Sequence, residues 1–264
     1  MPAAKYQRRK QIEGNGTAER PFDYPIRIGC AGWSIPRQFA GRFAPDGSHL
    51  ERYSQIFNCC EINSSFYRPH KNETWARWAA TVPAGFQFSV KLPRTITHEA
   101  KLNSPPELLS AFLGQIKHLG EKLGPILVQL PPSLEFNRRV AAKFLTTLRR
   151  RFLGEIVWEP RHATWFEADA AALLIDHGIA RVAADPACVP AAADPSGASH
   201  LVYFRLHGSP RRYFSAYEDD YLKRLSLQMK ELAKKDRVWC IFDNTALGAA
   251  TGNALELIAK GRQP

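Results

Sequence analysis

The sequence predicts an α/β fold, a single-domain (β/α)₈ TIM barrel, from three observations. From residue 26 onward, short apolar runs alternate with longer stretches of helical period, which is typical of repeated βα units. Eight such runs occur, the number that closes this barrel. No GxGxxG motif follows the first run, as a dinucleotide-binding open sheet would require, so closure is favoured over a doubly wound sheet.

The expected strands are 26–30, 59–63, 86–91, 126–130, 155–159, 180–185, 201–207 and 238–243. Amphipathic stretches predict helices at 73–80, 107–123, 140–151, 165–177 and 217–234. The connection 186–200 is rich in Ala, Pro, Asp and Ser and predicts no helix. Residues 1–24 lack a hydrophobic period, so we expect a flexible leader followed by one domain at 25–264.

Composition narrows the classes of function. No apolar run approaches the roughly 18 residues of a membrane span, and no signal-like segment opens the chain, so we expect a cytoplasmic protein that does not bind membranes. The five cysteines, an odd number without a CxxC pair, are expected to be reduced core residues. Cys59 and Cys60 should point to opposite faces of a strand, which makes a poor zinc site. The cysteines are Cys30, Cys59, Cys60, Cys188 and Cys240.

The net charge of +11 would suit a nucleic-acid partner, but the basic residues are spread along the chain. Only residues 8–10 and 149–151 form short basic runs. The second run ends a predicted helix, where cations favour the helix dipole. Nucleic acid is therefore a weaker expectation than a small ligand.

Polar residues follow the predicted strands, and in a barrel these ends gather on one face. They are Trp33, Glu61, Asn63, Lys91, Gln129, Glu159, Arg161, Asp185, Arg205, His207, Asp243 and Asn244. Side chains alternate along a strand, so Tyr203, Arg205 and His207 should share one face, as should Glu61 with Asn63 and Ser89 with Lys91. The alternative is a set of buried ion pairs, such as Glu159 with Arg161 or Arg205 with Asp243. His98 and His162 lie just past strand ends, where loop hydrogen bonding is the simpler role.

The last loop, residues 244–254, predicts an anion site. Gly248, Gly252, Thr251 and Asn253 are expected just before the final helix, whose free N–H groups would face an anion. Gly208 in the preceding loop would allow close approach of the backbone. An ordinary helix cap is the alternative.

Seven motifs resemble the family of unknown function 72, also called YecE-like. They are GCAGW (29–33), FNCCEINSSFYR (57–68), FQFSVKLPRTITH (86–98), LGPILVQLPPS (123–133), WEPRHATWF (158–166), YFRLHG (203–208) and FDNTALGAATGNAL (242–255). The resemblance implies a barrel fold but no established activity. It also implies importance for the polar residues at its motif positions. Members often carry Thr or Val in place of Cys59 and Cys60, and the segment 186–196 matches no motif.

The leading hypothesis is an enzyme, a hydrolase, lyase or isomerase, acting on a small anionic metabolite. Glu61, Glu159 or Asp243 would act as acid or base, with Lys91 and His207 completing the catalytic set and Arg161 and Arg205 holding charge. The expected substrate-binding residues are Trp33, Asn63, Tyr67, Gln129, Arg161, Arg205, Gly208, Asn244 and Gly248, with Trp165 as a further aromatic that could stack on a ring.

Other functions remain open at this stage. Glu159, Asp185, His207 and Asp243 could converge on a divalent metal, and no organic cofactor is indicated. A retaining glycosidase is disfavoured because strands four and seven end in Gln129 and His207 rather than paired carboxylates. A protein that binds nucleic acid or a phosphorylated ligand without turnover is the alternative from another class.

Overall fold

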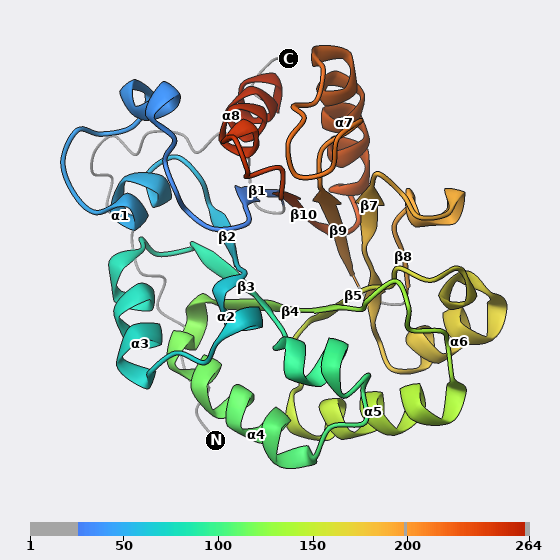
Figure 1. Ribbon diagram of the computed structural model, residues 1–264. Helices are drawn as coiled ribbons and strands as arrows, with labels where there is room; N and C mark the ends of the chain where they lie inside the picture. Colours follow the sequence, from blue (N-terminus) through green and yellow to red (C-terminus); the bar gives the residue numbers. More distant parts are fainter. Residues whose placement is uncertain (1–25, 198–199, 262–264) are drawn as a thin grey trace, which may run out of the picture.

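Parallel strands lie at the centre of the protein, with the helices arranged around them (Figure 1). The structure is a computed structural model that describes residues 26–197 and 200–261. The expected leader at 1–24, with the basic run 8–10, lies outside the described residues. The predicted α/β fold with parallel strands is confirmed.

The strands form two sheets. The first has the order β1 (Ile26–Cys30), β10 (Arg237–Phe242), β9 (Leu201–Leu206) and β7 (Ala183–Asp185), all parallel. The second has the order β2 (Cys59–Ile62), β3 (Gln87–Lys91), β4 (Leu123–Gln129), β5 (Ile156–Glu159), β6 (Ala180–Arg181) and β8 (Ser196–Gly197), of which only β8 is antiparallel. Each of the eight expected runs contains strand.

The helices follow the predicted periodicity. They are α1 (His49–Ser54), α2 (Ser64–Tyr67), α3 (Asn72–Thr81), α4 (Pro106–Ile116), α5 (Arg138–Arg151), α6 (Ala168–Asp176), α7 (Asp219–Leu232) and α8 (Ala249–Gly261). Short helical turns occur at η1 (Arg37–Arg42), η2 (Thr95–Glu99), η3 (Lys117–Lys122), η4 (Ala163–Phe166) and η5 (Pro190–Ala192). None of the described helices is long and apolar enough to cross a bilayer.

Two expected helices are shorter than predicted. The stretch 107–123 divides into α4 and η3, and inside η3 Gly120 takes a positive φ of 54°, which interrupts the helical path. The stretch 165–177 likewise divides into η4 and α6. The described part of 186–200 holds η5 and β8 but no α-helix, as predicted. Arg149, in the basic last turn of α5, donates to the carbonyls of Gly154, His177 and Gly178, so it anchors the neighbouring loops.

The core has two layers. The larger lies between strands and helices and includes Val202, Phe204 and Leu206. The smaller is enclosed by strands of both sheets and consists of Cys59, Leu127, Val157, Ala180, Val182, Leu201, Tyr203, Trp239 and Ile241. The expected alternation along 201–207 is therefore confirmed. Cys59 and Cys60 lie in different layers, as predicted. All five cysteines are free, but the expectation of a core position is wrong for Cys188, which is exposed.

Side chains join the two sheets between β1 and β2. Asn58 accepts from the Ile28 N–H at 2.9 Å and donates to the Ile26 carbonyl at 2.9 Å, in the manner of a neighbouring strand. The Tyr53 hydroxyl accepts from the Cys30 N–H at 2.7 Å and donates to the Cys59 carbonyl at 3.0 Å. The backbones also meet directly where Ala31 bridges Glu61.

The second junction is a single extended segment. Residues 180–181 pair with β5, and residues 183–185 pair with β9 in the other sheet. Val182 between them donates its N–H to the Trp158 carbonyl at 2.9 Å. One segment of chain thus belongs to both sheets.

We predict that Asn58→Ala lowers the free energy of unfolding by about 1–3 kcal/mol, because the buried backbone groups of Ile26 and Ile28 lose their partner. Urea denaturation measures the change. The matched control is Asn72→Ala at the exposed start of α3, which should leave the midpoint almost unchanged. Equal midpoints for the two variants would contradict the role of Asn58 in joining β1 to β2.

Candidate functional site

A buried guanidinium organises the polar cluster at the carboxyl ends of the strands. Arg205 in β9 is 1% exposed and binds Glu61 of β2 through Nε at 3.1 Å and Nη2 at 2.7 Å. Its Nη1 donates to Glu159 of β5 at 3.1 Å, and its Nη2 lies 3.1 Å from Asp243 after β10. One side chain therefore links three carboxylates carried by both sheets. We call Glu61, Ser89, Glu159, Arg161, Tyr203, Arg205, His207 and Asp243 the Arg205 network.

His207 bridges the other side of this network. Its Nδ1 lies 2.9 Å from Asp243 Oδ2, while its Nε2 lies 2.7 Å from Arg161 Nη2 and 2.9 Å from Glu159 Oε1. A guanidinium only donates, so a neutral His207 would carry its proton on Nδ1 and accept from Arg161 at Nε2. A protonated His207 would instead donate to Asp243 and Glu159. Both arrangements have hydrogen-bond partners in place.

Ion pairs keep the carboxylates of Glu159 and Asp243 ionised. Burial alone would raise the pKa of Glu159, but Arg161, Arg205 and His207 outweigh it and hold that pKa well below its ordinary value. Burial likewise opposes ionisation of Asp243, yet Arg205 and His207 lower its pKa. For Arg205, burial is outweighed by Asp243, Glu61 and Glu159, so its pKa rises well above the ordinary value. Glu159 and Asp243 are therefore ionised, and Arg205 charged, at neutral pH.

Two buried cationic side chains in or beside the Arg205 network retain donors without a partner among the described residues. Lys91 at the end of β3 is 7% exposed, and its Nζ makes no hydrogen bond or ion pair there; this atom lies 4.1 Å from the centre of the Phe66 ring. Arg161 pairs with Glu159 at 2.5 Å, but its buried Nε has no partner. Buried donors are usually satisfied, so these two are candidate contacts for a bound anion.

The alternation of strand residues explains why the cluster forms where it does. Along β2 the inward positions run from Cys59 to Glu61, and along β5 from Val157 to Glu159. Each inward face is thus apolar near the start of the strand and charged at its end. The expected ion pairs of Glu159 with Arg161 and of Arg205 with Asp243 are both present. The expected catalytic residues Glu61, Glu159, His207 and Asp243 lie together, with Lys91 beside them.

Some site residues were not predicted. The Tyr203 hydroxyl lies 2.9 Å from both Glu61 Oε2 and Ser89 Oγ, so it completes the pairing of Glu61. The shared parity of Tyr203 with Arg205, and of Ser89 with Lys91, was the signal that could have identified them. Tyr213 places its ring edge-on to His207 at 5.7 Å and has a positive φ of 70°, a strained conformation for a residue of this type.

Several expected binding residues have contacts of their own. Asn63 donates to Asp243 at 3.3 Å, so it lies at the network, and its buried Oδ1 has no partner in the described chain. Gln129 donates to the Leu130 carbonyl at 2.6 Å. Trp33 packs edge-on against Trp78 and Phe88, and Tyr67, 70% exposed, lines an apolar hollow beside α4. Trp165 is buried in the core, where Trp158 and Phe136 surround it.

The last loop differs from the prediction. Thr251 and Asn253 lie inside α8, which begins at Ala249, and not before it. The Ala250 and Thr251 N–H groups donate to Asn244 and Gly248 of the chain itself, and the Gly208 N–H donates to the Tyr217 hydroxyl. Asn244 ties the Ser215 carbonyl to Asn253. Gly248 packs against Pro36, so these residues are committed to loop structure.

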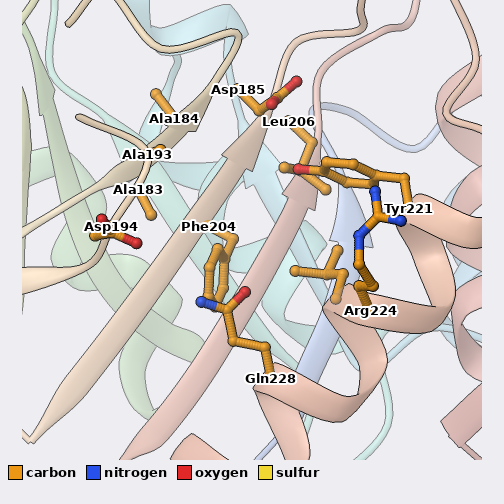
Figure 2. A pocket seen from close by; sticks show the side chains of 11 residues that line it. Ala183, Ala184, Asp185, Ala193, Asp194, Phe204, Leu206, Tyr221, Arg224 and Gln228 are labelled. Carbon is orange, nitrogen blue, oxygen red and sulfur yellow. The ribbon is translucent and has the colours of Figure 1, made fainter. Parts of the chain in front are cut away.

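The expected convergence of four metal ligands is wrong. Asp185 does not join Glu159, His207 and Asp243; it accepts from the Tyr217 hydroxyl at 2.8 Å and lines a separate hollow of about 250 Å³ between β7, β9 and α7, across which Arg224 and Gln228 project (Figure 2). The oxygens of Glu159 are taken up by arginines and His207. Among the described residues no group of three or more His, Cys, Asp or Glu is placed to hold a metal ion.

The two histidines past strand ends differ in their contacts, and His98 lies beside the residue that packs on Lys91. Its ring meets Phe66 edge-on at 4.9 Å, on the residue that covers Lys91, and its Nδ1 lies 2.8 Å from Thr97 Oγ1. Burial, followed by Lys91 and Arg94, lowers the pKa of His98. His162 caps η4 by accepting from the Thr164 N–H, the loop role expected for it.

Comparison with known proteins places this arrangement in one family. A family model described as "Protein of unknown function DUF72" matches residues 27–263. The UPF0759 protein YecE of Escherichia coli (strain K12) is 34% identical over 106 residues, 40% of this chain and 38% of that protein. The UPF0759 protein YunF of Bacillus subtilis (strain 168) is 28% identical over 150 residues, 53% of this chain and 52% of that protein. The chain thus matches only 38% and 52% of the lengths of these relatives.

Solved structures resemble the whole fold. A DUF72 family protein of Thermotoga maritima MSB8 has a TM-score of 0.76 at 26% identity, covering 89% of this chain and 98% of that one. A DUF72 family protein of Enterococcus faecalis V583 has a TM-score of 0.77 at 22% identity, covering 90% and 96%. The second likeness bears on the fold alone.

We predict that Arg205→Met lowers the free energy of unfolding by about 3–5 kcal/mol, because it leaves three buried carboxylates short of a counter-charge. The control is Arg138→Met, which breaks the exposed pair with Asp169 and should cost less than about 1 kcal/mol. Urea denaturation at neutral pH measures both. Equal losses in the two variants would show that the network does not hold the strand ends together.

The network also predicts a pH dependence of stability. Because the folded-state pKa of Glu159 is depressed, its contribution is present above the ordinary pKa of 4.5 and is lost as pH falls toward the folded value. The difference in unfolding free energy between the wild type and Glu159→Gln should therefore narrow as pH falls below about 5. Chemical denaturation over that range tests this, with the exposed Glu121→Gln as control. A difference that stays constant would contradict the ion pairing of Glu159.

Proposed function

The chain belongs to the family of proteins of unknown function DUF72. From the geometry of its site we propose that it is an enzyme that acts on a small anionic metabolite at the carboxyl ends of its strands. The observation that carries the proposal is the pair of donors without a partner in the described chain, Lys91 Nζ and the buried Arg161 Nε, beside His207, whose ring nitrogens face Asp243 and Glu159. A phosphate or carboxylate group would satisfy these donors, and a bound reactant would then lie next to His207.

The proposed roles differ in one respect from the sequence-based hypothesis. Glu159 and Asp243 are paired with guanidinium groups and have lowered pKa values, so neither suits a general acid at neutral pH. We assign them, with Glu61, to holding Arg161, Arg205 and His207 in place. His207 and Lys91 are the groups proposed to exchange protons with the substrate.

We also propose that the two sheets close into a (β/α)₈ barrel. The junction at Asn58 and Tyr53, the shared segment 180–185 and the enclosed layer of side chains from both sheets support closure. Close packing between β4 and β10, which belong to different sheets, also supports closure. A Cβ added to Gly124 of β4 would lie 2.8 Å from the Trp239 ring of β10. Closure would collect the strand ends into one mouth, where barrel enzymes carry their chemistry.

The test of the proposed activity is a screen of phosphate- and carboxylate-bearing metabolites for turnover. We expect Lys91→Ala to lower kcat/KM by about 100-fold or more, the usual contribution of a group that transfers a proton. Lys143→Ala, on the exposed surface of α5, is the matched control and should retain wild-type turnover. Glu159→Gln should also lose turnover, because it frees Arg161 and removes a partner of His207.

Binding without turnover is the competing outcome. Thermal shift on the same metabolites, together with nucleic-acid binding measured across salt concentrations, separates the two functions. If folded Lys91→Ala and Glu159→Gln match the wild type in every activity found, the proposed site is wrong. Tight binding of nucleic acid with a steep salt dependence, and no turnover, would favour the alternative.

A further inference from the structure

Lys91 is held at the end of β3 by contacts that leave its amine without a polar partner. Its carbonyl accepts from the Ser65 hydroxyl at 2.7 Å, and this bond places α2 against the strand. The next residue of α2, Phe66, lies with its ring 4.1 Å from Nζ. The side chain is buried, so water does not replace a protein partner for most of its surface.

The nearby carboxylates do not form an ion pair with the Lys91 amine. Glu61 is bound by Arg205 and Tyr203, and Glu159 by Arg205 and Arg161, so the network uses these oxygens itself. In the described part of the chain the Lys91 amine makes neither a hydrogen bond nor an ion pair. A buried ammonium group without a counter-charge is unfavourable, so the free energy of the neutral amine lies close to that of the charged form. Burial, followed by Arg205, lowers the pKa of Lys91 to about 8, although Glu61, Glu159 and Asp243 oppose the shift.

We propose that Lys91 is a nucleophile that forms an imine with the carbonyl carbon of a small anionic aldehyde, ketone or 2-oxo acid. This rests on the proposed function and names its substrate class. A lysine kept only to balance charge would be paired with one of the three carboxylates close to it. Lys91 instead has a neutral form accessible near pH 7, which is what attack on a carbonyl requires.

The reaction balances within the groups present. The lone pair of neutral Nζ forms a bond to the carbonyl carbon, and the C=O π electrons move to oxygen. One proton passes from nitrogen to that oxygen to give a carbinolamine. A second proton, taken from solvent or from protonated His207, allows the hydroxyl to leave as water and gives an iminium. Amine, carbonyl and one proton are thus consumed, and an iminium and one water are formed.

Two neighbours suit this step. The buried Arg161 Nε, without a partner among the described residues, would bind the carboxylate or phosphate of the substrate. The His98 ring meets Phe66, the residue over Lys91, edge-on at 4.9 Å, and its lowered pKa keeps it neutral at pH 7, so it adds no further positive charge near the amine. The other charged groups facing Lys91 are Arg205, Glu61, Glu159 and Asp243.

The test is reductive trapping of the full-length protein. Glyoxylate, pyruvate and dihydroxyacetone phosphate are each added with sodium cyanoborohydride, which reduces an iminium to a stable secondary amine. Glycolate, lactate and glycerol phosphate, which lack the carbonyl, are the controls. Peptide mass spectrometry then measures the modified fraction at Lys91, at the exposed Lys143 and Lys223, and at the terminal amine.

We expect at least one carbonyl probe to modify Lys91 about tenfold or more faster than Lys143 at pH 7, because a pKa near 8 gives a far larger neutral fraction than the ordinary 10.5. The trapping rate at Lys91 should rise with pH to a midpoint near 8. Lys91→Arg should abolish the adduct, whereas Lys143→Arg should not. The wild-type comparison stands even if a Lys91 variant does not fold.

Separate outcomes overturn the two proposals. Modification of Lys91 no faster than that of Lys143 with all three probes overturns the imine, even if Lys91→Ala abolishes turnover in the metabolite screen and the proposed function stands. Turnover retained by folded Lys91→Arg, and by Lys91→Ala, overturns both the proposed site and the imine that rests on it.

Discussion

The contact of Arg205 with three carboxylates is the interaction on which the arrangement of the strand ends depends. A buried guanidinium is favourable only if its donors are paired, and here the partners come from β2, β5 and the residue after β10. The strands that carry them belong to different sheets. Any movement of one sheet relative to the other would leave a charge unpaired in the interior, so the ion pairs fix the relative position of the strands that carry the candidate catalytic groups.

Further hydrogen bonds join the two sheets at the junction where few backbone hydrogen bonds link the neighbouring strands. Between β1 and β2 the direct pairing is limited to the bridge at Ala31, and the amide of Asn58 and the hydroxyl of Tyr53 supply the bonds that a full ladder would make. Gly29 is required at this junction, since a Cβ there would lie 2.1 Å from the Cys59 carbonyl oxygen. The GCAGW and FNCCE motifs, which resemble the family, therefore contain the residues that join the sheets, and part of their sequence signature reflects closeness of backbones rather than chemistry.

Local patterns predicted the strands and the set of polar strand ends because apolar runs and alternation are properties of neighbouring residues. The same alternation placed Arg205 and His207 on one face. It could not place Asp185, because the direction of that carboxylate is decided by Tyr217, 32 residues away. Nor could it show which carboxylate each arginine takes, since Glu61 and Arg205 are 144 residues apart in the chain. The start of α8 was misplaced because Gly252 and Asn253 resemble loop residues when the packing of Gly252 against the Phe39 ring is not known.

Some groups of the site keep their charge and others are proposed to exchange protons. This division explains how a fully paired network can take part in a reaction. A site in which every carboxylate titrated would change shape with each proton transfer. Here Glu159 and Asp243 stay ionised because guanidinium groups face them, so the surroundings of His207 hold an acceptor at each ring nitrogen in either protonation state. Lys91 takes no part in these ion pairs. Glu61, Glu159 and Asp243 act to raise its pKa, but none of them forms an ion pair with it in the described chain. Electrostatic groups that do not rearrange are the most effective at stabilising a developing charge. The Lys91 amine lies beside these groups and has no ion pair in the described chain, so a bound anion would stabilise it.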